Sequence, residues 1–189
     1  MTGTGWIIWA LAAFAPTPTA PPPSVPAALA PYGDVEIVWY DVEGRDARQV
    51  RRSIDAHRPV EPRSGERFDG LTNFDYHASW RGMEGGMCRS APEDFVYTIK
   101  VHLPRLADQR APARLRDSFG RYLETLAAHE AEHVKLALEN LAALQQAMAS
   151  APCDDVVGIM DRINGDYAKR QLRLDEVTDH GKTSITPLR

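Results

Sequence analysis

The sequence predicts an α+β fold in which strands come first and helices follow. Residues 35–42, 71–80 and 95–103 have the composition or the alternation of β-strands, and the third puts apolar side chains on one face. Residues 114–149 contain no proline and repeat leucine and aromatic side chains at helical spacing, and residues 156–174 continue the helical pattern. We therefore expect a small antiparallel sheet packed on a long helix and a C-terminal helix.

The ends of these elements have their own signals. A short helix is expected over residues 46–56, before a polar loop with several prolines and glycines. Pro104 is expected to end the third strand, and Pro152 to end the long helical stretch, which is either one helix or two abutting ones. Asp154 is expected to cap the last helix.

Composition indicates one globular domain behind an N-terminal extension. The chain has 189 residues, 43% of them hydrophobic and 25% charged, and a net charge of −4 without a basic run, which argues against nucleic-acid binding. Residues 1–20 contain a short uncharged apolar stretch and are predicted to be an export signal or a short N-terminal membrane anchor. Residues 21–31 read as a Pro/Ala-rich linker, and residues 32–189 as the folded domain.

The two cysteines, Cys88 and Cys153, fit an exported protein. An even count in an oxidising compartment predicts a disulfide between them, and the alternative is two separate thiols. The expected location is the periplasm or the outside of the cell, or else the periplasmic side of a membrane to which the chain is tethered.

The segment from His129 to His133 (His-Glu-Ala-Glu-His) carries the chemistry. Two histidines four apart lie on one face of a helix, where both imidazoles can bind the same zinc ion. Glu130 occupies the position of the general base in this motif, next to the water that zinc activates. The alternative is a pair of surface histidines. The pattern predicts a zincin-like hydrolase that uses Zn²⁺.

A third ligand is needed, because catalytic zinc sites keep three protein ligands and one open position. The residues directly after His133 continue the helix, so the ligand must come from elsewhere in the chain. We expect His180, because it follows the last helix and Gly181 lets the chain turn beside it. Asp175 and Asp179 are the alternatives, and either can instead orient a ligand histidine.

These features resemble the predicted secreted zinc-dependent proteases of bacteria, a family catalogued as a domain of unknown function. The resemblance covers residues 35–181. It rests on residues 40–44, Tyr76, Trp80, Cys88, residues 101–104, residues 129–133, Cys153 and residues 175–181. In the closing motif Asp175, Thr178, His180 and Gly181 match, whereas Leu174 stands where the family has tyrosine. If that tyrosine stabilises the transition state, the resemblance implies a slower or differently tuned enzyme.

The residues and the resemblance together predict an exported zinc metallopeptidase that acts on a peptide or protein substrate. Two alternatives stay open at this point. One is a zinc amidase that acts on a cell-wall peptide or another amide, and the other is a catalytically weak, metal-containing binding module.

Overall fold

The computed structural model describes residues 24–62, 64–108 and 110–189. The predicted signal or anchor, residues 1–20, lies outside this part of the chain. No helix in the described ranges is both long and apolar enough to cross a membrane. The main elements, in chain order, are β1 (Val35–Val42), α1 (Ala47–His57), β2 (Leu71–Ala78), β3 (Arg81–Gly82), β4 (Met87–Arg89), β5 (Phe95–Leu106), α2 (Ala113–Met148), β6 (Ala151–Pro152) and α3 (Val156–Thr178).

In the part of the chain that the structure describes, the main sheet has three strands in the order β1-β5-β2. β2 pairs with β5 in antiparallel fashion, as expected, but β1 pairs with β5 in parallel, with Val35 opposite Ile99. The prediction of an antiparallel sheet was therefore wrong for β1. The physical reason is that α1 and the loop after it carry the chain across before β2 begins, and strand composition alone does not reveal such a crossover.

β5 is the central strand, and it continues through Pro104 to Leu106, two residues beyond the predicted stop. The partner strand β2 ends its pairing opposite His102, so among the described residues β1 alone accompanies the part of β5 that contains the proline. Proline is tolerated where a strand has one neighbour, because the side without a partner needs no amide hydrogen. The alternation predicted for this strand is confirmed, since Ile99, Val101 and Leu103 are at most 1% exposed.

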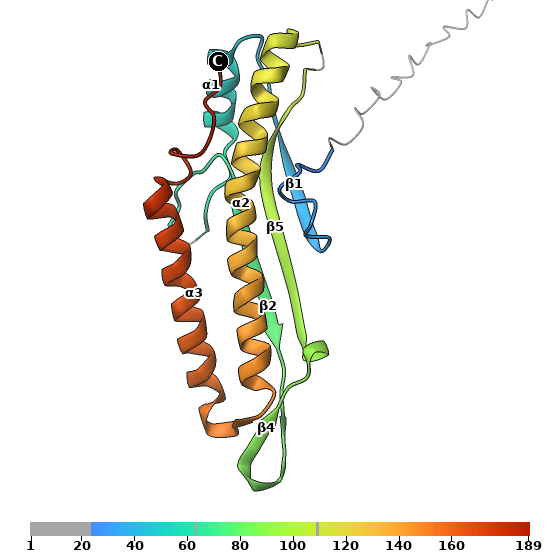
Figure 1. The fold of residues 1–189 in the computed structure, drawn as a ribbon, viewed down its shortest axis with the longest axis vertical. Coiled ribbons are helices and arrows are strands. Elements are labelled where there is room, and N and C mark those ends of the chain that lie inside the picture. Colours follow the sequence, from blue (N-terminus) through green and yellow to red (C-terminus); the bar gives the residue numbers. More distant parts are fainter. Residues whose placement is uncertain (1–23, 63, 109) are drawn as a thin grey trace, which may run out of the picture.

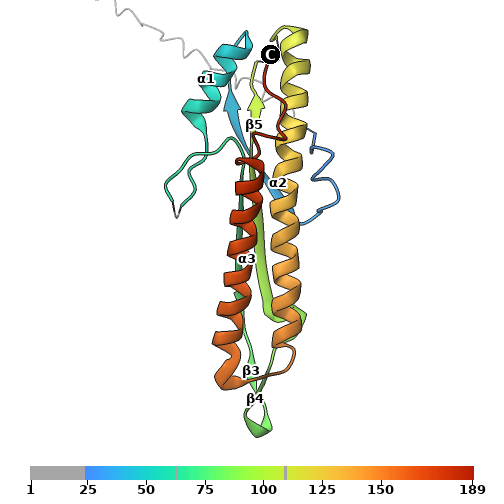
Figure 2. The same cartoon turned by 60° about the vertical axis from the view of Figure 1, so that its left-hand side comes forward.

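The two long helices lie antiparallel and side by side, and α2 packs on the sheet (Figures 1 and 2). α2 is a single helix of 36 residues, which settles the choice between one helix and two. Within α3, which the structure describes in full, Val156 is the one residue that is buried. α3 therefore packs through a shallow face and leaves much of its surface exposed.

A small second sheet closes the lower end of the molecule in Figure 1, where β4 pairs with β3 and β6. The predicted disulfide forms here, between Cys88 of β4 and Cys153 at the start of the turn that leads into α3. Asp154 lies in that 3-10 turn, and α3 begins after Asp155 without a side-chain cap. The base of α3 is thus bonded covalently to the strand segment.

The packed structure begins before Tyr32, where the folded domain was expected to start. Leu29 is 1% exposed and belongs to the main hydrophobic core. The main-chain amide of Ala27 also donates a hydrogen bond of 3.2 Å to Glu124 on α2. The last residues of the predicted linker therefore pack against the domain, because the apolar side chain at position 29 has a core to enter.

Candidate metal centre

The predicted metal residues lie where α2 faces both the sheet and α3. His129 and His133 are one turn apart, with ring centroids at 4.8 Å. His129 is 8% exposed and Glu130 is 3% exposed, although both are polar. Burial of two adjacent polar side chains is costly unless each has a hydrogen-bond or charge partner, so the partners of His129 and Glu130 define the site.

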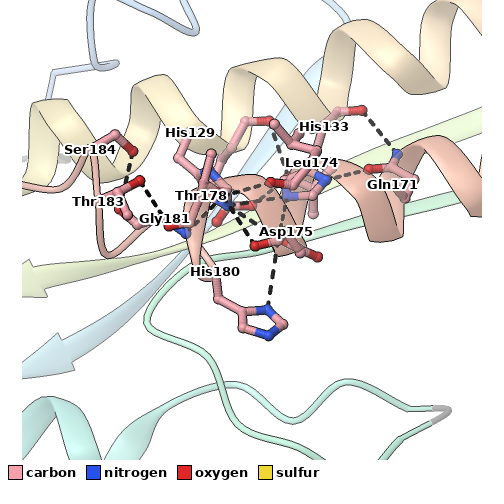
Figure 3. A network of polar contacts seen from close by, with 12 residues as sticks. His129, His133, Gln171, Leu174, Asp175, Thr178, His180, Gly181, Thr183 and Ser184 are labelled. Carbon is pink, nitrogen blue, oxygen red and sulfur yellow. Dashed lines mark hydrogen bonds and ion pairs between the residues drawn. The ribbon is translucent and has the colours of Figure 1, made fainter.

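Asp175, on the last turn of α3, supplies the third group. Its Oδ1 atom lies 3.4 Å from His129 Nε2 and 3.2 Å from His133 Nε2, and the two Nε2 atoms are 3.2 Å apart. Figure 3 shows the three side chains converging from α2 and α3. Within the described residues, these three form the group of histidine and carboxylate side chains able to hold a metal ion.

The spacing of these three atoms fits zinc. Two ligand atoms that each lie about 2.0–2.1 Å from a tetrahedral zinc ion are separated by roughly 3.3 Å. The observed separations of 3.2, 3.4 and 3.2 Å agree with that value. Nitrogen and carboxylate oxygen are also the donors that zinc takes in catalytic sites. The residues present therefore fit a zinc ion with three protein ligands.

Gln171 fixes the orientation of His133. Its Oε1 atom accepts a hydrogen bond from His133 Nδ1, and its Nε2 atom donates one of 3.3 Å to the main-chain oxygen of His133. When Nδ1 carries the hydrogen, the lone pair of the neutral ring is on Nε2, the atom that points at Asp175. Such an outer hydrogen bond is the usual support of a metal-binding histidine.

The charges of the site favour a cation. Burial would lower the pKa of His133, but its hydrogen bond to Asp175 and the charge of Glu130 outweigh burial and raise this pKa to about 9. Burial would raise the pKa of Asp175, but the hydrogen bonds from the two histidines hold it well below its usual value. A proton therefore occupies this carboxylate-lined site readily, and a metal ion can replace it.

Glu130 is held against β2. Thr72 donates a hydrogen bond of 2.8 Å from Oγ1 to Glu130 Oε2. A methyl group added to Gly70 would lie 2.4 Å from Glu130 Oε1, so only glycine leaves room for the carboxylate. Burial raises the pKa of Glu130, and the histidines and Thr72 act in the opposite direction. β2 therefore determines where the carboxylate of Glu130 lies.

A polar cluster fixes the start of β2. The carboxylate of Asp69 accepts hydrogen bonds from Arg51 on α1 (2.7 Å) and from the hydroxyl of Tyr122 on α2 (2.6 Å), and it pairs with Arg58 (2.9 Å). Tyr40 of β1 donates a 2.6 Å hydrogen bond to the main-chain oxygen of Asp69. β1, α1 with its C-cap, and α2 thus converge on the residue before Gly70. Nothing in the sequence pattern marked this cluster, because its members are scattered over more than 80 positions.

His180, the predicted third ligand, lies at the rim of the site. Its Nδ1 atom is 3.9 Å from Asp175 Oδ1, its side chain is 46% exposed, and its ring packs against Phe68 at 5.2 Å. The distances favour Asp175, one of the two alternatives, as the residue that completes the group with His129 and His133. A ligand role for His180 stays a prediction.

The closing motif shapes the turn after α3. Asp179, His180 and Gly181 all have positive φ, and Gly181 sits against the ring of His129, where an added methyl group would come within 3.2 Å. Thr178 accepts a hydrogen bond from the Gly181 amide (3.1 Å) and donates one to the main-chain oxygen of Leu174 (2.7 Å). The expected sharp turn at Gly181 is confirmed, and it lets the tail pass close to the metal site.

A groove of about 1820 Å³ contains the whole site. α2 contributes His129, Glu130 and His133 to it. β2 borders one side of the groove. α3 borders another through residues at helical spacing, namely Asn164, Tyr167, Ala168, Gln171, Leu172 and Asp175. The groove is large enough for a ligand of several residues.

The fold and the site define an α+β protein whose two long helices bring together a His-His-Asp group able to hold a metal ion. The chain belongs to the family described as bacterial protein of unknown function (DUF922), whose model matches residues 37–181. The match begins in β1 and ends at Gly181, so it contains the metal group and its supporting residues. No curated protein and no solved structure matches the chain.

Proposed function

We propose that this protein is an exported zinc-dependent hydrolase that cleaves peptide bonds. The observation that carries the proposal is the site itself. Three ligand atoms lie 3.2–3.4 Å apart, the spacing of a tetrahedral zinc shell, and a buried carboxylate follows the first histidine directly. A purely structural zinc site needs no such carboxylate, whereas hydrolysis needs a base.

His129, His133 and Asp175 would hold the ion. When bound, zinc supplies a Lewis acid that polarises a substrate carbonyl and lowers the pKa of a water molecule towards about 7. Glu130 accepts the proton of the attacking water and later passes it to the leaving amine. Thr72 and Gly70 keep this carboxylate in position, because one donates a hydrogen bond to it and the other leaves room for it.

We assign His180 to the rim, where a partly exposed imidazole can meet the substrate. The side chain lies beside Asp175 and lines the same groove. An imidazole there can donate a hydrogen bond to the substrate oxygen on which negative charge develops in the transition state. Leu174 has no donor group, whereas the ring of His180 can supply one at the rim of the groove.

The export part of the proposal rests on the disulfide. Cys88 and Cys153 are bonded, and disulfides persist in oxidising compartments such as the periplasm. The uncharged apolar stretch at the N-terminus agrees with export.

Two measurements test the proposed function. The full chain, purified with zinc present, should contain about one zinc ion per chain, and chelation should abolish hydrolysis of fluorescein-labelled casein. Glu130→Gln should keep the zinc and lower kcat by at least about 100-fold, the scale of a lost general base. Glu132→Gln is the matched control, because it makes the same change on the same helix at a side chain that is 59% exposed.

Two results would contradict this proposal. A zinc-replete preparation without bound zinc would remove the metal centre. Near-native turnover by Glu130→Gln would show that the carboxylate is not the base.

A further inference from the structure

We propose that the groove contains a subsite, away from the metal group, for the carboxamide side chain of a glutamine or asparagine residue of the substrate. Three side chains carry this proposal: Tyr76 of β2, Asn140 of α2 and Asn164 of α3. All three line the groove, and we call them the amide cluster. That the carboxamide belongs to a peptide rests on the proposed function, whereas the subsite itself rests on the geometry that follows.

The amide cluster is a chain of hydrogen bonds that crosses three elements. Asn140 donates a hydrogen bond of 3.2 Å from Nδ2 to Asn164 Oδ1, and Asn164 donates one of 2.7 Å from Nδ2 to the hydroxyl oxygen of Tyr76. Asn140 is 4% exposed, so its amide lies at the base of the groove rather than in open solvent. The chain therefore holds the three polar groups in fixed positions relative to one another.

Several hydrogen-bonding groups of the amide cluster remain available to a ligand. The Tyr76 hydroxyl accepts a hydrogen bond, but within the described part of the chain its own hydrogen has no acceptor. Oδ1 of Asn140 likewise has no donor among the described residues, and it is not one of the atoms that are sealed from solvent. A tie that merely joined the two helices and the sheet would not need these spare groups to face a groove.

The surroundings of the amide cluster favour an uncharged polar ligand. Phe74 stacks on Tyr76 with ring centroids 5.6 Å apart, and Tyr167 meets Phe74 edge-on at 5.8 Å. Asp75 also lines the groove, but strand alternation directs its exposed side chain to the opposite face of the sheet from Tyr76. A carboxylate or ammonium group would lose water here without meeting an opposite charge, whereas a carboxamide donates and accepts hydrogen bonds without a net charge.

The helices set the distance between the amide cluster and the metal group. Asn140 comes seven residues after His133, and Asn164 comes seven residues before Gln171. Both asparagines therefore lie about 10 Å along their helices from the contact between His133 and Gln171. Roughly three residues of extended chain span this distance. The recognised side chain thus belongs to a residue about three positions from the bond that is cleaved.

The first experiment maps the preference of the full, zinc-loaded chain. The substrate is a tryptic digest of a bacterial cell extract, and mass spectrometry compares the residues around each newly cleaved bond with their frequency in the digest. Glutamine and asparagine should be enriched at least about threefold at one position about three residues from the cleaved bond. Tyr76→Phe removes a hydroxyl group and Asn164→Leu removes an amide; each should abolish this enrichment and keep the zinc.

Two control variants make the same chemical changes outside the groove. Tyr97→Phe alters the residue that pairs with Tyr76 across β2 and β5, and its hydroxyl contacts Asp34 instead. Gln146→Leu removes an exposed amide from α2. Both should keep the enrichment. If Tyr76→Phe and Asn164→Leu instead lower the cleavage of all peptides alike and leave the preference in place, their role is structural and the proposal is overturned.

The second experiment needs no turnover. It records the side-chain amide NMR signals of Asn140 and Asn164 in the full Glu130→Gln chain with three capped tripeptides, Ala-Gln-Ala, Ala-Glu-Ala and Ala-Met-Ala. The glutamine peptide should shift these signals. The glutamate and methionine peptides, whose side chains have similar length, should not. A shift with N-acetylglucosamine but not with the glutamine peptide would assign the subsite to a sugar and overturn the proposal.

The outcomes separate this inference from the proposed function. If the glutamine peptide shifts the two asparagine signals in a chain that cleaves nothing, the subsite stands and the hydrolase fails. If the chain cleaves the digest without enrichment of glutamine or asparagine, the subsite fails and the hydrolase stands.

Discussion

Gly70→Ala should disable the reaction without touching a metal ligand. The added methyl group would lie 2.4 Å from Glu130 Oε1 and 2.9 Å from Cδ, whereas ordinary contact begins at 3.4 Å. The carboxylate must therefore move by about 1 Å, because Asp69, beside Gly70, is fixed by hydrogen bonds from two helices. A misplacement of this size lowers turnover by about 100-fold.

The assay compares kcat on labelled casein for the wild type, Gly70→Ala and Gly82→Ala, with zinc content measured in each. Gly82 is the matched control, since a methyl group there meets nothing within 4 Å. Wild-type turnover by folded, zinc-loaded Gly70→Ala would refute the claim that β2 positions the base. If Gly70→Ala does not fold, Thr72→Val tests the same claim, because it removes the hydrogen bond to Glu130 and keeps the shape of the side chain.

Three further predictions concern the ligand set, the disulfide and the polar cluster. Asp175→Ala should weaken zinc affinity by more than about 10-fold, whereas His180→Ala should keep the zinc and lower kcat. Competition with a chelator measures the zinc affinity of both variants, and the labelled-casein assay measures kcat. A larger loss of zinc affinity in His180→Ala than in Asp175→Ala would make His180 the ligand. Joint replacement of Cys88 and Cys153 by serine should lower the free energy of unfolding by about 4 kcal/mol for a sequence separation of 65, and unchanged urea denaturation would contradict this. Burial would raise the pKa of Asp69, but hydrogen bonds from a guanidinium and a tyrosine hydroxyl outweigh burial and lower it. A lowered pKa means that the carboxylate stabilises the fold above about pH 4 and loses this effect as pH falls through the folded-state pKa. Urea denaturation should therefore show the wild type more stable than Asp69→Asn at pH 7, with a difference that shrinks as the pH falls below about 4. A difference that does not change with pH would refute the assignment.

Local patterns were sufficient to predict most elements of the fold. The alternation in β5 and the helical spacing in α2 depend on neighbours in the sequence, and both elements form as expected. The direction of β1 and the burial of Leu29 depend instead on which distant segment lies alongside, and both differ from the prediction. The polar cluster around Asp69 could not be predicted for the same reason, because it exists only after four segments have met.

The third member of the metal group shows where prediction from a sequence stops. The helical pattern was read as ending at residue 174, which placed Asp175 in an irregular tail, and His180 was the expected third ligand because it follows the helix beside Gly181. α3 in fact continues to Thr178, so Asp175 lies one turn after Gln171 on the same face. These two side chains contact the two ring nitrogens of His133.

Two pairs at the spacing i, i+4 therefore face each other across antiparallel helices. His129 and His133 form one pair, and Gln171 and Asp175 form the other. Each pair is visible in the sequence, but their alignment depends on how far α3 is shifted along α2. The disulfide of Cys153 fixes the base of α3, and further along the helix Asn140 donates a 3.2 Å hydrogen bond to Asn164. The His-His-Asp group that could hold a metal ion is thus a property of the register between two helices, and contacts far from these three residues determine that register.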